Sequence, residues 1–169
     1  ELVANQLHRN DYFVRHSRRL LQERHVAGVD LEDARKELIR MLDMGNHPVD
    51  RQLRFLWALH GAGGVGEKRL TALLDHANEH VRSWAVRLIG EGGHPTGEQF
   101  EKISKLASDG KSRLVRLYVA STFPRFSETQ KWTLAKDLLL DFGYAEDQNL
   151  PYMIWYALLP LVEADPGRA

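Results

Sequence analysis

The sequence predicts an all-α protein in which about five helical hairpins stack into a right-handed superhelix. Apolar residues recur every three to four positions and seldom alternate, as expected for helices rather than strands. Capping residues and glycine- or proline-rich breaks divide the chain into short segments. One helical pattern also recurs along the chain, which is typical of repeat proteins whose units bury their apolar faces by stacking.

The helix expected at 79–90 shows this pattern most fully. Val81, Trp84 and Leu88 fall on one apolar stripe of a helix. Asn78 can cap the start of this helix by accepting a hydrogen bond from a first-turn N–H group. The glycines at its end readily adopt the left-handed conformation that stops a helix: Gly90, Gly92 and Gly93.

The other expected helices have similar boundaries. With 79–90, they cover residues 2–8, 11–24, 31–44, 49–60, 66–76, 97–108, 112–123, 128–142 and 150–163. Asp30 precedes the helix at 31–44 and Gly45 follows it. Two reciprocal capping boxes are expected, pairing Thr96 with Gln99 and Ser127 with Gln130. Asn149 precedes the last helix, where Pro151 lies in the first turn and interrupts no helical hydrogen bond.

The recurring pattern is a Val-Arg pair near the start of a helix. It occurs at Val14-Arg15, Val81-Arg82 and Val115-Arg116, with the last two 34 residues apart. Three residues before each valine is a residue of a capping type: Asp11, Asn78 and Ser112. Six residues after these caps lie Ser17, Trp84 and Tyr118, and the same count from Asn149 reaches Trp155. The segment 49–60 keeps the apolar stripe but not the offset, so it is the least regular copy.

The period alone fits tetratricopeptide repeats of about 34 residues better than HEAT repeats of about 40–47. The tetratricopeptide pattern of Trp, Leu-Gly, Tyr and Ala-x₃-Phe is not found at any phase. An Asp or Asn cap followed by Val-Arg, at the start of a pair's second helix, resembles the short HEAT type. We therefore expect HEAT-like pairs that form a single repeat domain over residues 1–169.

A narrower resemblance rests on five segments in order. They are HRNDYFVRHSRRLLQER, LRFLWALHGAGG, LLDHANEHVRSWAVRLIGEGG, SRLVRLYVASTFPRF and NLPYMIWYALLPLVEADPGRA. This run resembles the helical-repeat segment of large secreted proteins of Planctomycetes and Verrucomicrobia known as membrane-bound dehydrogenases or haem-binding Cys-x-x-Cys-His proteins. The resemblance implies a β-propeller before this segment, a c-type cytochrome module after it, and a periplasmic or secreted location. Dehydrogenase activity would then belong to the parent protein.

Composition excludes several classes of function. The 169 residues include 23 Lys and Arg and 23 Asp and Glu, without the basic excess of nucleic-acid-binding proteins. Cysteine is absent, which excludes disulfides, Cys-ligated zinc and covalently attached c-type haem within these residues. No apolar run approaches the roughly 20 residues of a membrane-spanning helix. Because the chain begins at Glu1 and lacks a signal-peptide pattern, we expect it to be a piece of a larger multidomain protein.

Arg15, Arg82 and Arg116 occupy equivalent positions in the recurring pattern. In a stacked array, equivalent positions form a ladder along one face. Such a ladder could bind an acidic partner, or each guanidinium could bridge to a carboxylate or helix cap of the adjacent repeat. We favour the structural interpretation. The arginine-rich segment HSRRLLQERH, with Arg18 and Arg19, is expected to be a solvated face.

The aromatic residues on apolar stripes are expected to pack in the core: Trp57, Trp84, Tyr118 and Trp155. For Trp84 we expect burial between neighbouring helices, so that alanine at this position would cost about 3–5 kcal/mol of stability.

Two motifs resemble ligand sites. His76 and His80 have the i, i+4 spacing of metal ligands, but Asn78 between them is expected to cap a helix, which favours a polar turn. GAGGVGE at 61–67 resembles a phosphate-binding loop, yet it follows a helix and lacks the Lys-Ser or Lys-Thr that would meet phosphate. We expect a turn there, and neither catalytic residues nor a cofactor or metal site in this chain.

The sequence thus predicts a non-catalytic helical scaffold that packs against neighbouring domains of the same polypeptide or another protein. One alternative is a segment that contributes to a substrate or haem crevice of the parent redox enzyme. Another is a free-standing adaptor for a protein partner.

Overall fold

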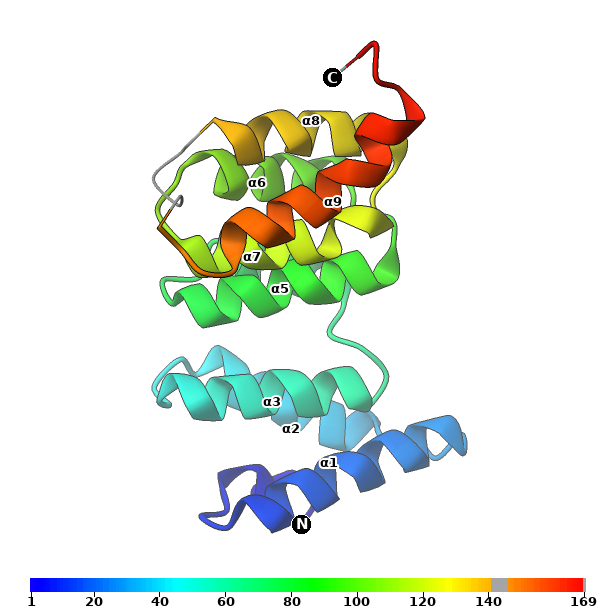
Figure 1. The fold of residues 1–169 in the computed structure, drawn as a ribbon. Coiled ribbons are helices and arrows are strands. Elements are labelled where there is room, and N and C mark those ends of the chain that lie inside the picture. The colour runs from blue at the N-terminus through cyan, green and yellow to red at the C-terminus, as the bar shows by residue number, and fades with distance from the viewer. Residues whose placement is uncertain (141–145, 169) are drawn as a thin grey trace. The chain divides into compact units, whose positions relative to one another are not determined.

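The structure is a computed structural model that describes residues 1–140 and 146–168. Within those ranges it contains nine α-helices, two short 3₁₀ helices and no strand, which confirms the prediction of an all-α protein (Figure 1). The chain divides into two compact units, residues 1–67 and 68–169, each of which is described by itself. A single repeat domain over the whole chain stays a prediction. The helix expected at 128–142 ends at Leu139, and residues 141–142 of the expected range lie outside the described residues.

The helices match most of the expected ranges. The first unit contains η1 (Ala4–Leu7), α1 (Asp11–Val26), α2 (Glu32–Asp43) and α3 (Val49–Gly61). The second contains most of α4 (Glu67–Leu73), then α5 (Glu79–Gly92), α6 (Gly97–Ser108), α7 (Arg113–Thr122), η2 (Phe123–Arg125), α8 (Glu128–Leu139) and α9 (Leu150–Ala164).

Two other expected helices are also shorter than predicted. The segment 2–8 forms a single 3₁₀ turn, which the Asn5 side chain ties to α1 by donating to Ser17 Oγ at 2.9 Å. The segment 66–76 is helical only to Leu73, because the N–H groups of Asp75 and His76 bond to carbonyls three residues back instead of continuing the helix. The second correction concerns a helix end, which sequence patterns define least well.

Most predicted caps are present. Asn78 accepts from the His80 N–H group at the start of α5, and both reciprocal capping boxes form at α6 and α8. At α1 the prediction was wrong by one residue: Asn10 is the cap and accepts from the Tyr12 N–H group, while Asp11 begins the helix. At α5 the helix continues through Gly90 to Gly92 and ends at Gly93, whose φ is 75°.

The first unit packs α1 and α2 against α3. Its core consists of side chains from each of these helices, with Val14 and Leu21 from α1, Leu38 from α2, and Phe55 and Leu59 from α3. The 3₁₀ turn η1 contacts both α1 and α3. Its Gln6 is fully buried and donates from Nε2 to the Val14 carbonyl at 3.4 Å.

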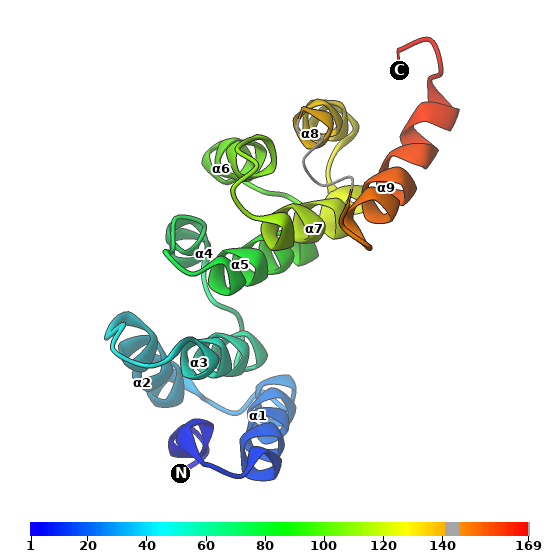
Figure 2. The same cartoon turned by 60° about the vertical axis from the view of Figure 1, so that its left-hand side comes forward.

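The second unit places its helices in two rows. Figure 2 shows α5, α7 and α9 in one row and α4, α6 and α8 in the other, with α7 in contact with both α5 and α9, and α6 in contact with α8. The core lies between the rows and contains Ile103, Val115, Val119, Leu134 and Leu138, all fully buried. Each helix presents one apolar stripe to the opposite row and buries it there.

The start of α9 depends on Asp147 rather than on the predicted Asn149. Asp147 Oδ1 accepts from the N–H groups of Asn149 and Leu150, each at 2.9 Å. The bond from the Leu150 N–H group is the largest cause of a lowered pKa of the Asp147 carboxyl group, and the bond from Asn149 is the next largest. A carboxylate that accepts backbone N–H groups satisfies donors that the first helical turn leaves without partners.

This lowered pKa predicts a pH-dependent contribution to stability. Because the folded-state pKa lies below the unfolded value of about 4, the contribution is present above pH 4 and is lost as the pH falls through the folded pKa. Urea unfolding of the wild type and of Asp147→Asn should therefore differ most near pH 5 to 6, and the difference should shrink on acidification. A difference that stays constant down to pH values of about 2 would contradict this role.

Candidate functional site

The three equivalent arginines do not form one exposed stripe. Arg15 is exposed and pairs with Asp11 on its own helix. Arg82 is half-buried and donates from Nη1 to the carbonyls of His76 and Ala77, at 2.7 and 2.8 Å, in the turn before α5. Each side chain therefore has a local structural contact.

Of the three arginines, Arg116 is the least suited to binding a partner at the surface. It is only 1% exposed, and its Nη2 donates to the Leu138 carbonyl in α8. Side chains at equivalent positions of the sequence pattern are thus buried to different extents. A partner at the surface could contact Arg15 but not Arg116. Arg116 is therefore not available to an exposed basic stripe.

The aromatic residues also differ from the prediction of core packing. Trp84 is half-buried rather than enclosed, with the Arg87 guanidinium 4.9 Å from its ring centroid and the Tyr118 ring 6.3 Å away. Tyr118 and Trp57 are likewise half-buried, and Trp155 is 61% exposed. At the same register in α1, Ser17 is buried, and its Oγ accepts a hydrogen bond from the Asn5 side chain of η1. The equivalent positions therefore line the edge of the core, and only part of each ring is enclosed.

Among the described residues of the second unit, the most exposed large aromatic side chains lie on helix α9. Tyr152, Trp155 and Tyr156 are 66%, 61% and 67% exposed, and their i, i+3, i+4 spacing places them on one face. The opposite face of α9 is buried in the core, through Leu150, Ile154, Ala157, Leu158 and Leu161. Helices that are apolar on two sides are usually buried on both sides. The exposed aromatic face of α9 is therefore apolar in the way of a surface that contacts another protein.

An apolar groove of about 490 Å³ lies on the same unit, between η2, α8 and α9. Its lining includes Phe123, Trp132 and Pro160. Pro160 has no N–H group, so the carbonyl of Tyr156 receives no helical hydrogen bond from it. Near the groove, the Arg168 guanidinium lies 4.8 Å from the Trp132 ring centroid. Apolar walls with a few polar groups are the usual composition of a binding groove.

His76 lies in the polar turn that the sequence favoured, and His80 lies in the first turn of α5. His76 Nδ1 accepts from the Asn78 N–H group at 3.0 Å, and Asn78 in turn caps α5. The neighbouring carboxylate of Asp75 accepts from Lys102 Nζ at 2.6 Å, a bond that raises the pKa of Lys102. Across the described parts of the chain, no group of three or more His, Asp or Glu side chains has the arrangement of a metal site.

The glycine-rich segment 61–67 connects α3 to α4 as a turn, as predicted. Gly63, Gly64 and Gly66 all have positive φ values, between 84° and 110°. At Gly63 an added Cβ would lie 2.9 Å from the His25 ring, and Arg35 Nη1 donates to the Ala62 carbonyl beside it at 2.8 Å. Gly63 thus lets the turn approach the His25 and Arg35 side chains closely, whereas Gly64 and Gly66 supply only the positive φ values of the turn.

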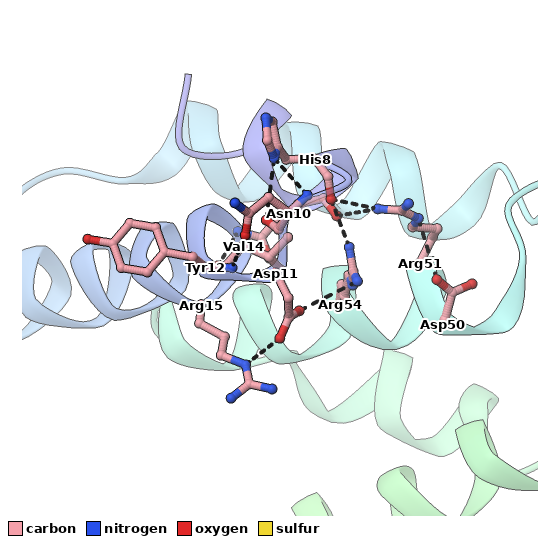
Figure 3. Close-up of polar contacts among 10 residues, drawn as sticks. His8, Asn10, Asp11, Tyr12, Val14, Arg15, Asp50, Arg51 and Arg54 are labelled. Carbon is pink, nitrogen blue, oxygen red and sulfur yellow. Dashed lines mark hydrogen bonds and ion pairs between the residues drawn. The ribbon is translucent and has the colours of Figure 1, made fainter.

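A second polar surface lies on the first unit, where α1 and α3 meet. Figure 3 shows Arg15 and Arg54 directed toward the carboxylate of Asp11, with Arg51 and Arg54 both donating to the His8 carbonyl. The latter two bonds are each 3.2 Å long. The sequence does not predict this cluster, because Arg54 lies in the least regular repeat and 43 residues from Asp11 along the chain.

The described residues form helices and turns without a strand, so the fold defines an all-α protein. Comparison of the chain with family models, curated proteins and solved structures finds no match. Of the helices described, none is long and apolar enough to cross a membrane.

Proposed function

We propose that this chain is a helical-repeat scaffold, built of HEAT-like pairs in a right-handed superhelix, that binds protein partners through the exposed aromatic face of α9. The observation that carries the proposal is the exposure of Tyr152, Trp155 and Tyr156 on one side of a helix whose other side is already in the core. Tyrosine and tryptophan dominate binding energy at protein interfaces, because their rings bury a large area at low entropic cost.

The partner proposed first is a neighbouring domain of the same polypeptide, as the sequence resemblance implies. In that setting the chain itself is non-catalytic, holds no cofactor and acts by positioning the domains on either side. A free-standing adaptor would use the same α9 face for a separate protein. A segment of a haem or substrate crevice would bring the face against the cofactor-bearing module of a redox enzyme.

Site-specific photo-crosslinking tests this role. A photoreactive phenylalanine at Trp155 should give a defined cross-link in the intact parent protein expressed in its native cells. The same group at Lys136, an exposed position on α8, is the matched control and should give none. Equal cross-linking from both positions, or none from Trp155, would contradict a specific contact surface.

The cross-linked peptide also separates the three roles. A peptide of the same polypeptide without haem supports the scaffold, and a haem-bearing Cys-x-x-Cys-His peptide supports the redox crevice. A peptide of a different protein supports the adaptor. As a folding control, Trp155→Ser with Tyr156→Ser should leave the free energy of unfolding within about 0.5 kcal/mol per site, because both side chains are largely in solvent.

A further inference from the structure

A groove of about 460 Å³ lies on the first unit between α1 and α3. It is lined by Asp11, Arg15, Arg18, Arg19, Gln22, Arg54 and Trp57. Four of these seven side chains are guanidinium groups and one is a carboxylate. The sequence predicted a solvated face for this part of α1, but the fold adds Arg54 and Trp57 from α3 and turns that face into the wall of a concave site.

The charge in this groove is concentrated relative to its surroundings. Residues 1–67 contain ten Lys and Arg and ten Asp and Glu, so the unit as a whole carries no excess charge. Of the acids near the groove, Glu23 lies 3.3 Å from Arg19, and Asp50 lies 3.4 Å from Arg51 outside the lining. A neutral unit that gathers four arginines around one aspartate has a local positive potential that favours an anion.

Asp11 is already shared between two of the arginines. It pairs with Arg15 on its own helix and lies 3.5 Å from Arg54 Nη2 (Figure 3). Arg54 also donates from Nη1 to the His8 carbonyl at 3.2 Å, so its guanidinium is held at the groove by two contacts. Arg54 is thus presented in a defined position, which lowers the entropic cost of binding a ligand.

Arg18 lies at the back of this site. Its guanidinium carbon is 5.0 Å from the Trp57 ring centroid, and its Nε is buried without a hydrogen-bond partner. Burial lowers the pKa of Arg18, Asp11 opposes this effect, and Arg54 and Arg15 lower the pKa further. An arginine stays protonated in proteins, so the charge that Asp11 compensates only in part and the unsatisfied donor of Arg18 both favour an incoming acceptor.

The geometry points to a binding site for a doubly charged tetrahedral oxyanion, a phosphate or sulfate group, held by Arg15, Arg18 and Arg54. Guanidinium groups bind such anions through paired N–H donors, and the several oxygens of a dianion can satisfy more than one arginine. A carboxylate ligand would bring only one negative charge, as Asp11 already does, whereas a phosphate or sulfate group brings two. Trp57 provides an apolar wall for whatever carries the anion, such as the organic part of a phosphate or sulfate ester. This site is independent of the α9 face.

Titration with inorganic phosphate tests the inference on the intact 169-residue chain. The Nε–H resonances of Arg18 and Arg54, followed by NMR, should shift saturably with a dissociation constant of about 1 mM or tighter at low salt, and Arg54 remains as the probe in variants of Arg18. Arg18→Gln and Arg15→Gln should each weaken binding about tenfold or more. The matched control is Arg24→Gln, an exposed arginine of the same helix outside the groove, and should change affinity less than twofold.

Further ligands separate the sources of the anion. Acetate at equal ionic strength should bind at least about tenfold more weakly than phosphate. Sulfate should compete with phosphate, and phenyl phosphate should bind more tightly than inorganic phosphate if an ester is the natural ligand. A saturable shift with acetate of equal affinity, an equal loss in Arg24→Gln, or no saturation up to about 10 mM phosphate would each overturn the inference. Circular dichroism of each variant establishes that the helices are retained.

Discussion

Phe123→Ala is expected to lower the free energy of unfolding by about 3–5 kcal/mol. Phe123 is 1% exposed at the junction of α7 and η2 and belongs to the core of the second unit. Truncation removes a buried aromatic ring and leaves a cavity that surrounding helices fill only partly. Urea unfolding followed by circular dichroism gives the measurement.

Trp84→Ala is the matched comparison for Phe123→Ala, because both aromatic residues belong to the second unit. Trp84 is half-buried and covered partly by Arg87, so its loss should cost clearly less than the loss of Phe123. This expectation replaces the sequence-based one, in which Trp84 itself cost about 3–5 kcal/mol. If Trp84→Ala were the more damaging of the two, the assignment of the core would be wrong.

Gly90→Ala should destabilise the protein by about 1–3 kcal/mol, although alanine favours helices. Gly90 lies inside α5, where an added Cβ would be 2.8 Å from Cβ of Thr122 at the end of α7. That distance is too short for two carbon atoms, so α5 and α7 must move apart. Thermal unfolding monitored at two protein concentrations would measure the effect and exclude association.

Gly92→Ala is the control within the same helix. Gly92 is exposed and has no atom within 4 Å of the position of an added Cβ. Alanine there should be neutral or stabilise by up to about 1 kcal/mol through helix propensity. Equal effects at both glycines would show that backbone conformation, and not the approach of α5 to α7, determines the response.

The contrast between these glycines shows why sequence reasoning misplaced the end of α5. Three glycines in four residues predict a helix end, and Gly93 does adopt the left-handed conformation. Gly90 is instead helical and serves the close contact with Thr122. A contact between residues 32 positions apart leaves no local pattern in the sequence. The sequence therefore predicts that the helix ends near these glycines, but not that Gly90 allows the close contact with Thr122.

For the two candidate surfaces as well, the sequence predicts one part and the fold decides the other. The exposed aromatic residues of α9 are visible in the sequence as an apolar segment, but which side meets the core depends on how α9 lies against α7. The arginine groove was predicted only as a charged face of α1. Its concavity arises because α3 brings Arg54 and Trp57 beside Arg18.

The sequence by itself determined the helical class, most helix boundaries, the capping boxes and the turn at 61–67, because each depends on hydrogen bonds and backbone preferences within a few residues. Tertiary structure alone decided how deeply each member of the recurring pattern is buried. Arg15 and Arg116 share a place in that pattern, yet one is in solvent and the other donates to a carbonyl of α8. Burial depends on which elements pack over a residue, and these come from distant parts of the chain.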